Sequence, residues 1–234
     1  MIRECRIHGF FRAEQCPSCG AEGLFILNDY EQEQVSKLMA TMLRHMPSQF
    51  GITVDKNGWA DIMDIVRSID NKKRDFKWLR PKHIIALVST DPKERFEIRD
   101  NLVRATYGHS MDLDLDLPTD NIPTKLYYPT TEDEVEILIE AGIKPTDRKK
   151  VHLSGTTEQA LNAGYVRSNN PIIVEIDAEN AIKDGYVIKR ANKYIYLCDE
   201  VDPKYIKRID TEKLKESLNS EGESKESNDT DFSE

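Results

Sequence analysis

Apolar residues recur at helical spacing between positions 29 and 47. The members of this stripe follow a period of three to four residues and define one face of a helix: Val35, Leu38, Met39, Met42, Leu43 and Met46. Asp29 and Gln32 can form a capping box at its start, and Pro47 is expected to end it. At about 100° per residue, Arg44 lies opposite the stripe and His45 lies on its flank. The pattern predicts a helix that packs on one side and presents Arg44 on the other.

Residues 51–110 predict two more helices and a hairpin. Residues 51–69 are typical of a short strand, a turn at Asn57-Gly58 and a helix from Asp61, and Pro81 begins another helix that runs to about Ser89. Residues 95–105 predict a β-hairpin around Asp100-Asn101.

In a hairpin with this turn, Ile98 pairs with Val103 and Glu97 pairs with Arg104. Phe96, Ile98, Val103 and Ala105 then share the core face, and Arg104 projects from the other face. Three helices and a hairpin suggest a winged-helix arrangement.

The second half of the chain predicts an α+β lobe. Residues 111–121 alternate Asp with Leu, contain Pro118 and are typical of a connection between lobes. Strands are expected at 125–128, 150–153, 172–176, 187–188 and 194–198, and helices at 131–141, 158–163 and 179–182. Residues 212–234 are almost free of apolar side chains and are expected to be disordered.

The first 27 residues contain four possible metal ligands. Cys5 and His8 form one pair, and Cys16 and Cys19 form a second pair with the same spacing. The segment is too short to bury a core, and zinc can supply the missing folding energy. We therefore expect a closed, structural zinc ribbon. Cys198 is expected to be a small buried residue on a strand.

Composition favours a globular protein with an uneven charge. The chain has 234 residues, a hydrophobic fraction of 38% and a formal net charge of -9. Residues 209–234 carry nine acidic and three basic side chains, whereas residues 31–110 carry 14 basic and 11 acidic ones. A mildly basic first lobe supports an RNA contact made by a few arginines. With neither a membrane-length apolar run nor a signal peptide, we expect a cytoplasmic protein that does not bind membranes.

Two segments, Leu43-Arg44-His45-Met46-Pro47 and Val103 to Ser110, each hold an arginine and a histidine close together in the sequence. A guanidinium keeps its charge and offers a planar set of donors that suits a phosphate, and histidine can move a proton near neutral pH. Arg167 is a further candidate in the second lobe. The sequence has no P-loop, no G-x-G-x-x-G motif opening a helix and no acidic cluster beside the arginines. Protein cations are therefore expected to stabilise charge in any phosphate chemistry.

The chain resembles a known family, the RNA 2′-phosphotransferases (tRNA 2′-phosphotransferases). The similar segments occur in the family's order between residues 35 and about 206: Leu43-Arg44-His45-x-Pro47, Gly58-Trp59, Arg95-Phe96-x-Ile98, Arg104-Ala105-x-Tyr107-Gly108-His109-Ser110, Val151-His152-Leu153-Ser154, and Pro171 through Ile176-Asp177-Ala178. The N-terminal metal-binding extension resembles that of archaeal members.

The resemblance implies an α+β protein with five parts. These are a zinc-ribbon extension (1–27), a winged-helix RNA-binding lobe (28–110), a linker (111–122), an NAD-binding lobe like that of ADP-ribosyltransferases (123–209) and a disordered acidic tail (210–234). It also implies a reaction in which an internal RNA 2′-phosphate attacks the nicotinamide ribose of NAD+. The ribose 2″-hydroxyl then attacks the phosphate, which gives 2′-OH RNA, nicotinamide and ADP-ribose 1″,2″-cyclic phosphate.

The resemblance also assigns residues. The catalytic tetrad corresponds to Arg44, His45, Arg104 and Arg167. NAD contacts correspond to Thr130, His152, Leu153 and Ser154, and RNA contacts to Tyr107, His109 and Ser110. Tyr128-Pro129 stands here where the family often has His-Gly, so this chain lacks an imidazole and a flexible glycine at the start of the NAD lobe.

The implied partners are NAD+ and an RNA with a 2′-phosphate, expected to be tRNA, and the implied protein is a monomer. The sequence leaves two alternative functions open. An ADP-ribosyltransferase acting on terminal RNA or DNA phosphates would stop after the first step. A non-catalytic zinc-ribbon and winged-helix nucleic-acid-binding module would leave the C-terminal lobe without a role.

Overall fold

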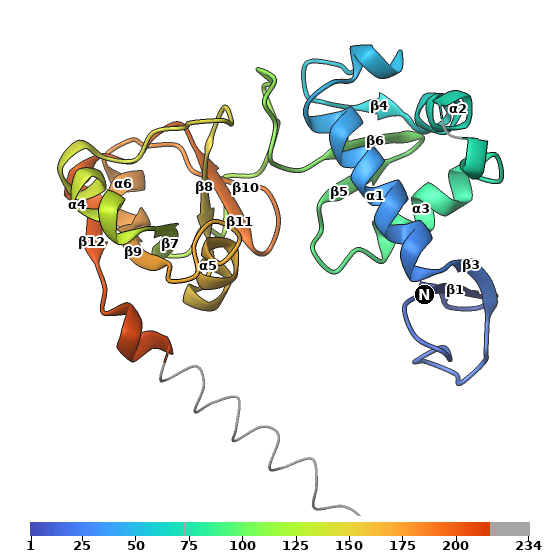
Figure 1. Cartoon of the computed structure of the whole chain (residues 1–234), viewed down its shortest axis with the longest axis horizontal. Helices are drawn as coiled ribbons and strands as arrows, with labels where there is room; N and C mark the ends of the chain where they lie inside the picture. The colour runs from blue at the N-terminus through green and yellow to red at the C-terminus, as the bar shows by residue number, and fades with distance from the viewer. Residues whose placement is uncertain (73, 216–234) are drawn as a thin grey trace, which may run out of the picture. The chain divides into compact units, whose positions relative to one another are not determined.

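The computed structural model describes residues 1–72 and 74–215, and its chain divides into two compact units (Figure 1). Unit 1 comprises Met1–Leu117 together with Asp147–Lys149, and unit 2 comprises Pro118–Thr146 and the chain from Lys150 onward. Among these residues, no helix has the length and apolar character needed to cross a membrane. The predicted five-part division, with its finer boundaries, stays a prediction.

Unit 1 begins with a small antiparallel sheet. Its strands are β1 (Ile2–Cys5), β2 (Gly9–Phe11) and β3 (Leu24–Leu27), in the order β2-β1-β3. Ile2 and Leu27 are fully buried in the main core of unit 1, whereas Cys5, Phe11 and Cys16 form a small separate cluster. The sheet therefore ties the Cys/His segment to the rest of the unit.

Helix α1 (Asp29–Arg44) follows this sheet, and its start differs from the prediction by one residue. Asn28 is the N-cap, and it exchanges hydrogen bonds with Glu31 rather than using the predicted Asp29 and Gln32 pair. The predicted apolar stripe is buried up to Leu43, with Leu38 only partly buried. Met46 is 38% exposed because the helix has already ended at the C-cap His45, so its place in the stripe was wrong.

The core of unit 1 is completed by two helices and a second antiparallel sheet. Helices α2 (Ile62–Lys72) and α3 (Pro81–Ser89) match the prediction closely. The strands β4 (Ala60–Asp61), β5 (Phe96–Arg99) and β6 (Leu102–Ala105) lie in the order β4-β6-β5. Short 3₁₀ turns occupy Ser48–Phe50 and Arg74–Phe76. The short strand expected just after residue 51 is absent from this part of the structure, and only β4 forms there.

The hairpin register is confirmed. Ile98 faces Val103 and Glu97 faces Arg104 across β5 and β6. Arg104 does leave the strand on the face opposite Val103, but that face is covered, so its side chain is only 5% exposed. The predicted face for Arg104 is therefore confirmed, and its burial is an addition from the structure, because a strand pattern cannot show what packs over the hairpin.

Unit 2 is built on one antiparallel sheet in the order β10-β11-β8-β7-β9-β12. Its strands are β7 (Lys125–Thr130), β8 (Val151–Ser154), β9 (Ile172–Asp177), β10 (Lys189–Arg190), β11 (Ile195–Cys198) and β12 (Ile206–Arg208). Helices α4 (Glu132–Ala141) and α6 (Ala178–Lys183) pack in the larger core, which also holds Leu153. Helix α5 (Thr157–Gly164) packs with Ile173 and Tyr127 on the other face (Figure 1).

Three expectations for unit 2 need correction. Residues 187–188 are not a strand, and the pairing with β11 uses Lys189 and Arg190 instead. Strand β12 was missed, although it forms one edge of the sheet beside β9, after the 3₁₀ turn Pro203–Tyr205. The tail begins later than predicted, because Thr211 is buried and its hydroxyl accepts a hydrogen bond from the Ile173 amide at 3.0 Å. The rest of the predicted tail, from residue 216, lies outside the described residues. Cys198 is buried on β11, as expected.

Candidate phosphate-binding site

The end of α1 is fastened to the segment after the hairpin. The backbone N–H of Ser110 donates to the carbonyl of Arg44 at 3.0 Å, and the Ser110 hydroxyl lies 3.1 Å from Nδ1 of His45. This contact fixes the imidazole ring and occupies Nδ1. Within the described residues, Nε2 of His45 has no hydrogen-bond partner and can face a ligand. The structure thus brings together His45 and Ser110, which the sequence had placed 65 residues apart.

The guanidinium of Arg44 packs between aromatic rings rather than in open solvent. It lies 4.7 Å from the Tyr107 ring centre and 5.9 Å from that of Phe96. Burial, with the positive charges of Arg148 and Arg95, holds the pKa of Arg44 below its usual value, although Tyr107 acts in the opposite direction. Arg44 keeps its charge nonetheless, because a guanidinium is not deprotonated in proteins at neutral pH.

Two N–H groups of this guanidinium are unused. The Nε and Nη2 atoms of Arg44 are buried, and neither has a hydrogen-bond partner among the residues described. Buried donors are normally satisfied, because leaving one without a partner costs about 1–3 kcal/mol. A pair of unused charged donors fits the oxygens of a phosphate.

His109 lies close to all three predicted cations of unit 1. Burial first, then the charges of Arg44, His45 and Arg104, lower the pKa of His109 from 6.5 to about 4. Its side chain is buried, and Nε2 has no partner in the described part of the chain. At neutral pH this histidine is therefore a neutral imidazole. His45 is more exposed, but burial and the nearby Arg44 and Arg148 also lower its pKa.

Arg104 is held differently from Arg44. Its guanidinium carbon lies 4.4 Å from the Trp59 ring centre, and its Nη1 donates to the Asn57 carbonyl at 3.2 Å. Its Nε binds the Glu97 carboxylate, and its Nη1 also binds the carboxylate of Asp116. Arg104 is therefore a buried cation that already has anionic partners.

Unit 2 places its predicted ligand-binding residues on two faces of the sheet. Tyr127 pairs with Ser154, so His152 and Ser154 share the face that α5 covers. Leu153 lies in the opposite core, and Thr130 also points to that side, where its hydroxyl lies 3.3 Å from Glu134. A hydrogen bond of 2.9 Å between Nδ1 of His152 and the Lys150 carbonyl fixes the imidazole ring.

Arg167 lies in the exposed loop between α5 and β9. Its backbone N–H donates to the carbonyl of Gly164 at 2.9 Å, which folds the loop back on the end of the helix. No carboxylate of the described residues forms an ion pair with its side chain. Its guanidinium is thus available to a ligand, and it belongs to unit 2.

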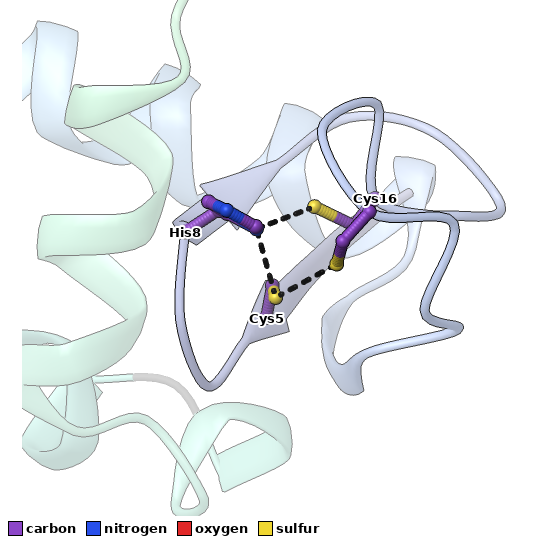
Figure 2. Close-up of side chains that lie close together, drawn as sticks. Cys5, His8 and Cys16 are labelled. Carbon is purple, nitrogen blue, oxygen red and sulfur yellow. Dashed lines mark hydrogen bonds between the residues drawn. The ribbon is translucent and has the colours of Figure 1, made fainter.

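A compact group of Cys and His side chains lies at the first sheet, with Cys5 at the end of β1 and the others in the turns that connect the strands. The possible ligand atoms of Cys5, His8, Cys16 and Cys19 all lie within 4.8 Å of one another. Figure 2 shows the imidazole of His8 facing the sulfur atoms of Cys5 and Cys16, at 3.6 and 3.5 Å from Nδ1. The Cys5 and Cys19 sulfurs are 3.7 Å apart. Backbone N–H groups of Ile7 and His8 stabilise the Cys5 thiolate and lower the pKa of this thiol to about 6.

Comparison with known proteins places these features in a family. The sequence model described as "RNA 2'-phosphotransferase, Tpt1 / KptA family" matches residues 30–200. A protein named "Probable RNA 2'-phosphotransferase 1" from Archaeoglobus fulgidus is 42% identical over 88% of this chain and 94% of its own length. The chain belongs to the RNA 2′-phosphotransferase family. A protein named "Probable RNA 2'-phosphotransferase" from Thermoplasma volcanium is 39% identical over 91% of this chain and 90% of its own length. One of the same name from Methanosarcina barkeri is 38% identical over 88% of this chain and 98% of its own length.

For a member of this family, the structure adds residues that the sequence did not single out. Arg148 belongs to unit 1, because the next backbone N–H, that of Lys149, donates to the His109 carbonyl at 3.2 Å. Its only signal in the sequence is a run of three basic residues before Val151. Asp116 is one of several similar Asp residues in the 111–121 segment, so nothing in the sequence distinguished it.

Proposed function

We propose that this protein removes an internal 2′-phosphate from RNA and uses NAD+ as the acceptor. The observation that carries the proposal is the pair of buried, unpartnered N–H groups on Arg44, next to a histidine whose ring Ser110 holds in place. Membership of the RNA 2′-phosphotransferase family supports the RNA phosphate as the reacting group. The dependence on NAD+ and the individual steps are inferences from the family resemblance.

In the first step, an oxygen of the RNA 2′-phosphate forms a bond to C1″ of the nicotinamide ribose. The bond from C1″ to the nicotinamide nitrogen breaks, and nicotinamide leaves with that electron pair. In the second step, the ribose 2″-oxygen attacks phosphorus, and the bond from phosphorus to the RNA 2′-oxygen breaks. The proton lost by the 2″-hydroxyl balances the proton gained by the RNA 2′-oxygen.

Arg44, His45 and Arg104 are proposed to hold the RNA phosphate, since all three belong to unit 1. Arginines keep their protons and can stabilise the negative charge of both transition states. His45 is proposed to donate to the phosphate or to move the proton. Arg167 belongs to unit 2, where the attacking ribose hydroxyl is expected to lie, and is proposed to act in the second step.

Unit 1 is proposed to be a winged-helix RNA-binding lobe, and unit 2 an NAD-binding lobe like that of ADP-ribosyltransferases. Three helices and a hairpin support the first assignment. For the second, the hydroxyl of Ser154 and the imidazole of His152 lie on the same face of the sheet and suit ribose hydroxyls. Thr130 and Leu153 point to the opposite face, so any part they have in NAD+ binding is proposed to act through their backbone.

The Cys/His group is proposed to bind one zinc ion. Zn–S bonds of about 2.3 Å and Zn–N bonds of about 2.0–2.1 Å in a tetrahedron separate two sulfurs by about 3.7 Å and a sulfur from a nitrogen by about 3.5 Å. The 3.5, 3.6 and 3.7 Å separations of these side chains fit that geometry. Four protein ligands close the site, so its proposed role is structural.

The expected setting is cytoplasmic tRNA maturation after splicing, carried out by a monomer.

Product analysis with a synthetic oligoribonucleotide that carries one internal 2′-phosphate tests the activity. The protein, NAD+ and the oligonucleotide are incubated without added metal, and both products are weighed by mass spectrometry. Unphosphorylated RNA with an equal amount of ADP-ribose cyclic phosphate is expected. A stable ADP-ribosylated RNA would instead favour a transferase that stops after the first step, and unchanged RNA would contradict the proposal.

A further inference from the structure

The environment of Arg104 is unusual for a residue that must bind an anion. Its side chain is 5% exposed and contacts two carboxylates, those of Glu97 and Asp116, which are 39% and 50% exposed. Glu97 binds Nε, whereas Asp116 binds Nη1. These two carboxylates offset the charge of Arg104 and occupy its N–H groups, which weakens its attraction for any further anion.

Only Nη2 of Arg104 has no hydrogen-bond partner within the described residues. A phosphate that binds a guanidinium in the strong, bidentate way needs two neighbouring N–H groups. Both neighbours of the unused Nη2 group, Nε and Nη1, already donate to a carboxylate. A phosphate can therefore engage Arg104 fully only if it displaces Glu97 or Asp116.

Asp116 is the partner that can leave. Glu97 faces Arg104 across the β5–β6 hairpin, so the strand register holds it in place. Asp116 belongs to the irregular segment that follows Ser110, in which no helix or strand forms, and it is the more exposed of the two carboxylates. The hydrogen bond from Arg104 also lowers the pKa of Asp116, which keeps this carboxylate charged.

We propose that Asp116 is an internal anion on Arg104 that the RNA 2′-phosphate displaces, whereas a backbone phosphodiester leaves it in place. A phosphomonoester carries a charge of about -1.5 to -2 at neutral pH, whereas a diester carries about -1. The attraction of a guanidinium for the monoester is therefore up to about twice its attraction for the diester or for a carboxylate. Asp116 thus competes with the 2′-phosphate for Arg104 and weakens its binding, and it occupies Arg104 while no 2′-phosphate is bound. The inference rests on the proposed function.

The test compares the binding of two oligoribonucleotides that differ only in one internal 2′-phosphate. Dissociation constants are measured without NAD+ at one fixed salt concentration, since salt alone changes RNA affinity. The variant Asp116→Asn keeps the shape of the side chain and removes its charge. The matched control is Asp112→Asn, an exposed residue of the same segment with no hydrogen bond or ion pair in the part of the chain described here. Both variants change the net charge equally.

For Asp116→Asn we expect affinity for the 2′-phosphorylated RNA to rise about tenfold, the effect typical of a hydrogen bond to a charged group, because the phosphomonoester no longer has to displace a carboxylate. Affinity for the unmodified RNA should rise less. The ratio of the affinity for the 2′-phosphorylated RNA to that for the unmodified RNA should therefore rise, and Asp116→Glu should keep it near the wild-type value. Asp112→Asn should leave the ratio unchanged.

An unchanged or smaller ratio in Asp116→Asn overturns the inference, as does an equal rise in the control. Weaker binding of the 2′-phosphorylated RNA would show that Asp116 instead positions Arg104. If Asp116→Asn does not fold, Asp116→Ser makes the same comparison. A wild-type protein without preference for the 2′-phosphorylated RNA counts against the proposed function itself, whereas a wild-type preference that Asp116→Asn does not enlarge counts only against Asp116.

Discussion

Replacing Gly108 with alanine should weaken RNA phosphate binding more than it weakens the fold. Gly108 has a φ of 87°, and a Cβ built there would lie 3.4 Å from Cδ, Nε and Cζ of Arg44. The added methyl group would press on the face of the Arg44 side chain and turn its unused N–H donors away from a bound phosphate. Losing a hydrogen bond from a charged donor costs about 1.5–3 kcal/mol, so the affinity for 2′-phosphorylated RNA should fall about tenfold or more.

The same substitution also strains the backbone. An alanine in a left-handed conformation costs about 1–2 kcal/mol, and the reduced freedom of the unfolded chain returns about 0.4–1 kcal/mol. The net loss of about 1 kcal/mol should lower Tm by about 2–4 °C. Gly51 provides a matched control, because its φ is 69° and a Cβ there would meet nothing within 4 Å.

The assay is therefore a pair of measurements on Gly108→Ala and Gly51→Ala: thermal unfolding, and binding of an oligoribonucleotide with one 2′-phosphate. Both variants should lose similar stability, and only Gly108→Ala should lose affinity. Equal affinity losses in the two variants, or wild-type binding by Gly108→Ala, would refute the assignment of the Arg44 donors to the phosphate.

Three further outcomes are expected. Cys16→Ser should release the proposed zinc and lower Tm, and a wild-type protein in which elemental analysis finds no zinc would contradict this. Turnover by the wild-type protein should continue in EDTA while elemental analysis shows that the zinc is retained. Loss of turnover in EDTA with the zinc in place would contradict a purely structural role. Arg167→Ala should let ADP-ribosylated RNA accumulate in single-turnover experiments, and slower turnover without accumulation would remove Arg167 from the second step. The pKa of His109 is lowered from 6.5 to about 4, so folding disfavours its protonation and stability should be lost as pH falls through that range. His109→Gln should reduce this loss by up to about 3 kcal/mol in denaturant unfolding series at several pH values, and an unchanged pH profile would show that His109 does not titrate this way.

The sequence alone determined features that depend on near neighbours. Apolar spacing located α1, and Pro81 marked the start of α3. The hairpin register followed from the two-residue turn, because turn length fixes pairing. The paired Cys-x2-His and Cys-x2-Cys spacings predicted a compact metal-ligand group for the same reason, since each pair lies within a single turn.

Boundaries were less well determined, for a physical reason. Asn28 and Glu31 compete with Asp29 and Gln32 for the start of α1, and both pairs suit a capping box. Strand β12 is only three residues long, and it is recognisable mainly through its pairing with β9. Short edge strands of this kind carry little periodic signal.

Only the tertiary structure decided the electrostatics of the candidate site. A periodic pattern indicates which face of a strand Arg104 uses, but not that Trp59 and Asp116 enclose it there. The unused donors of Arg44 and the place of Arg148 in unit 1 depend likewise on packing between distant segments. Burial and charge at a site are sums over neighbours in space, and most of those neighbours lie far away along the chain.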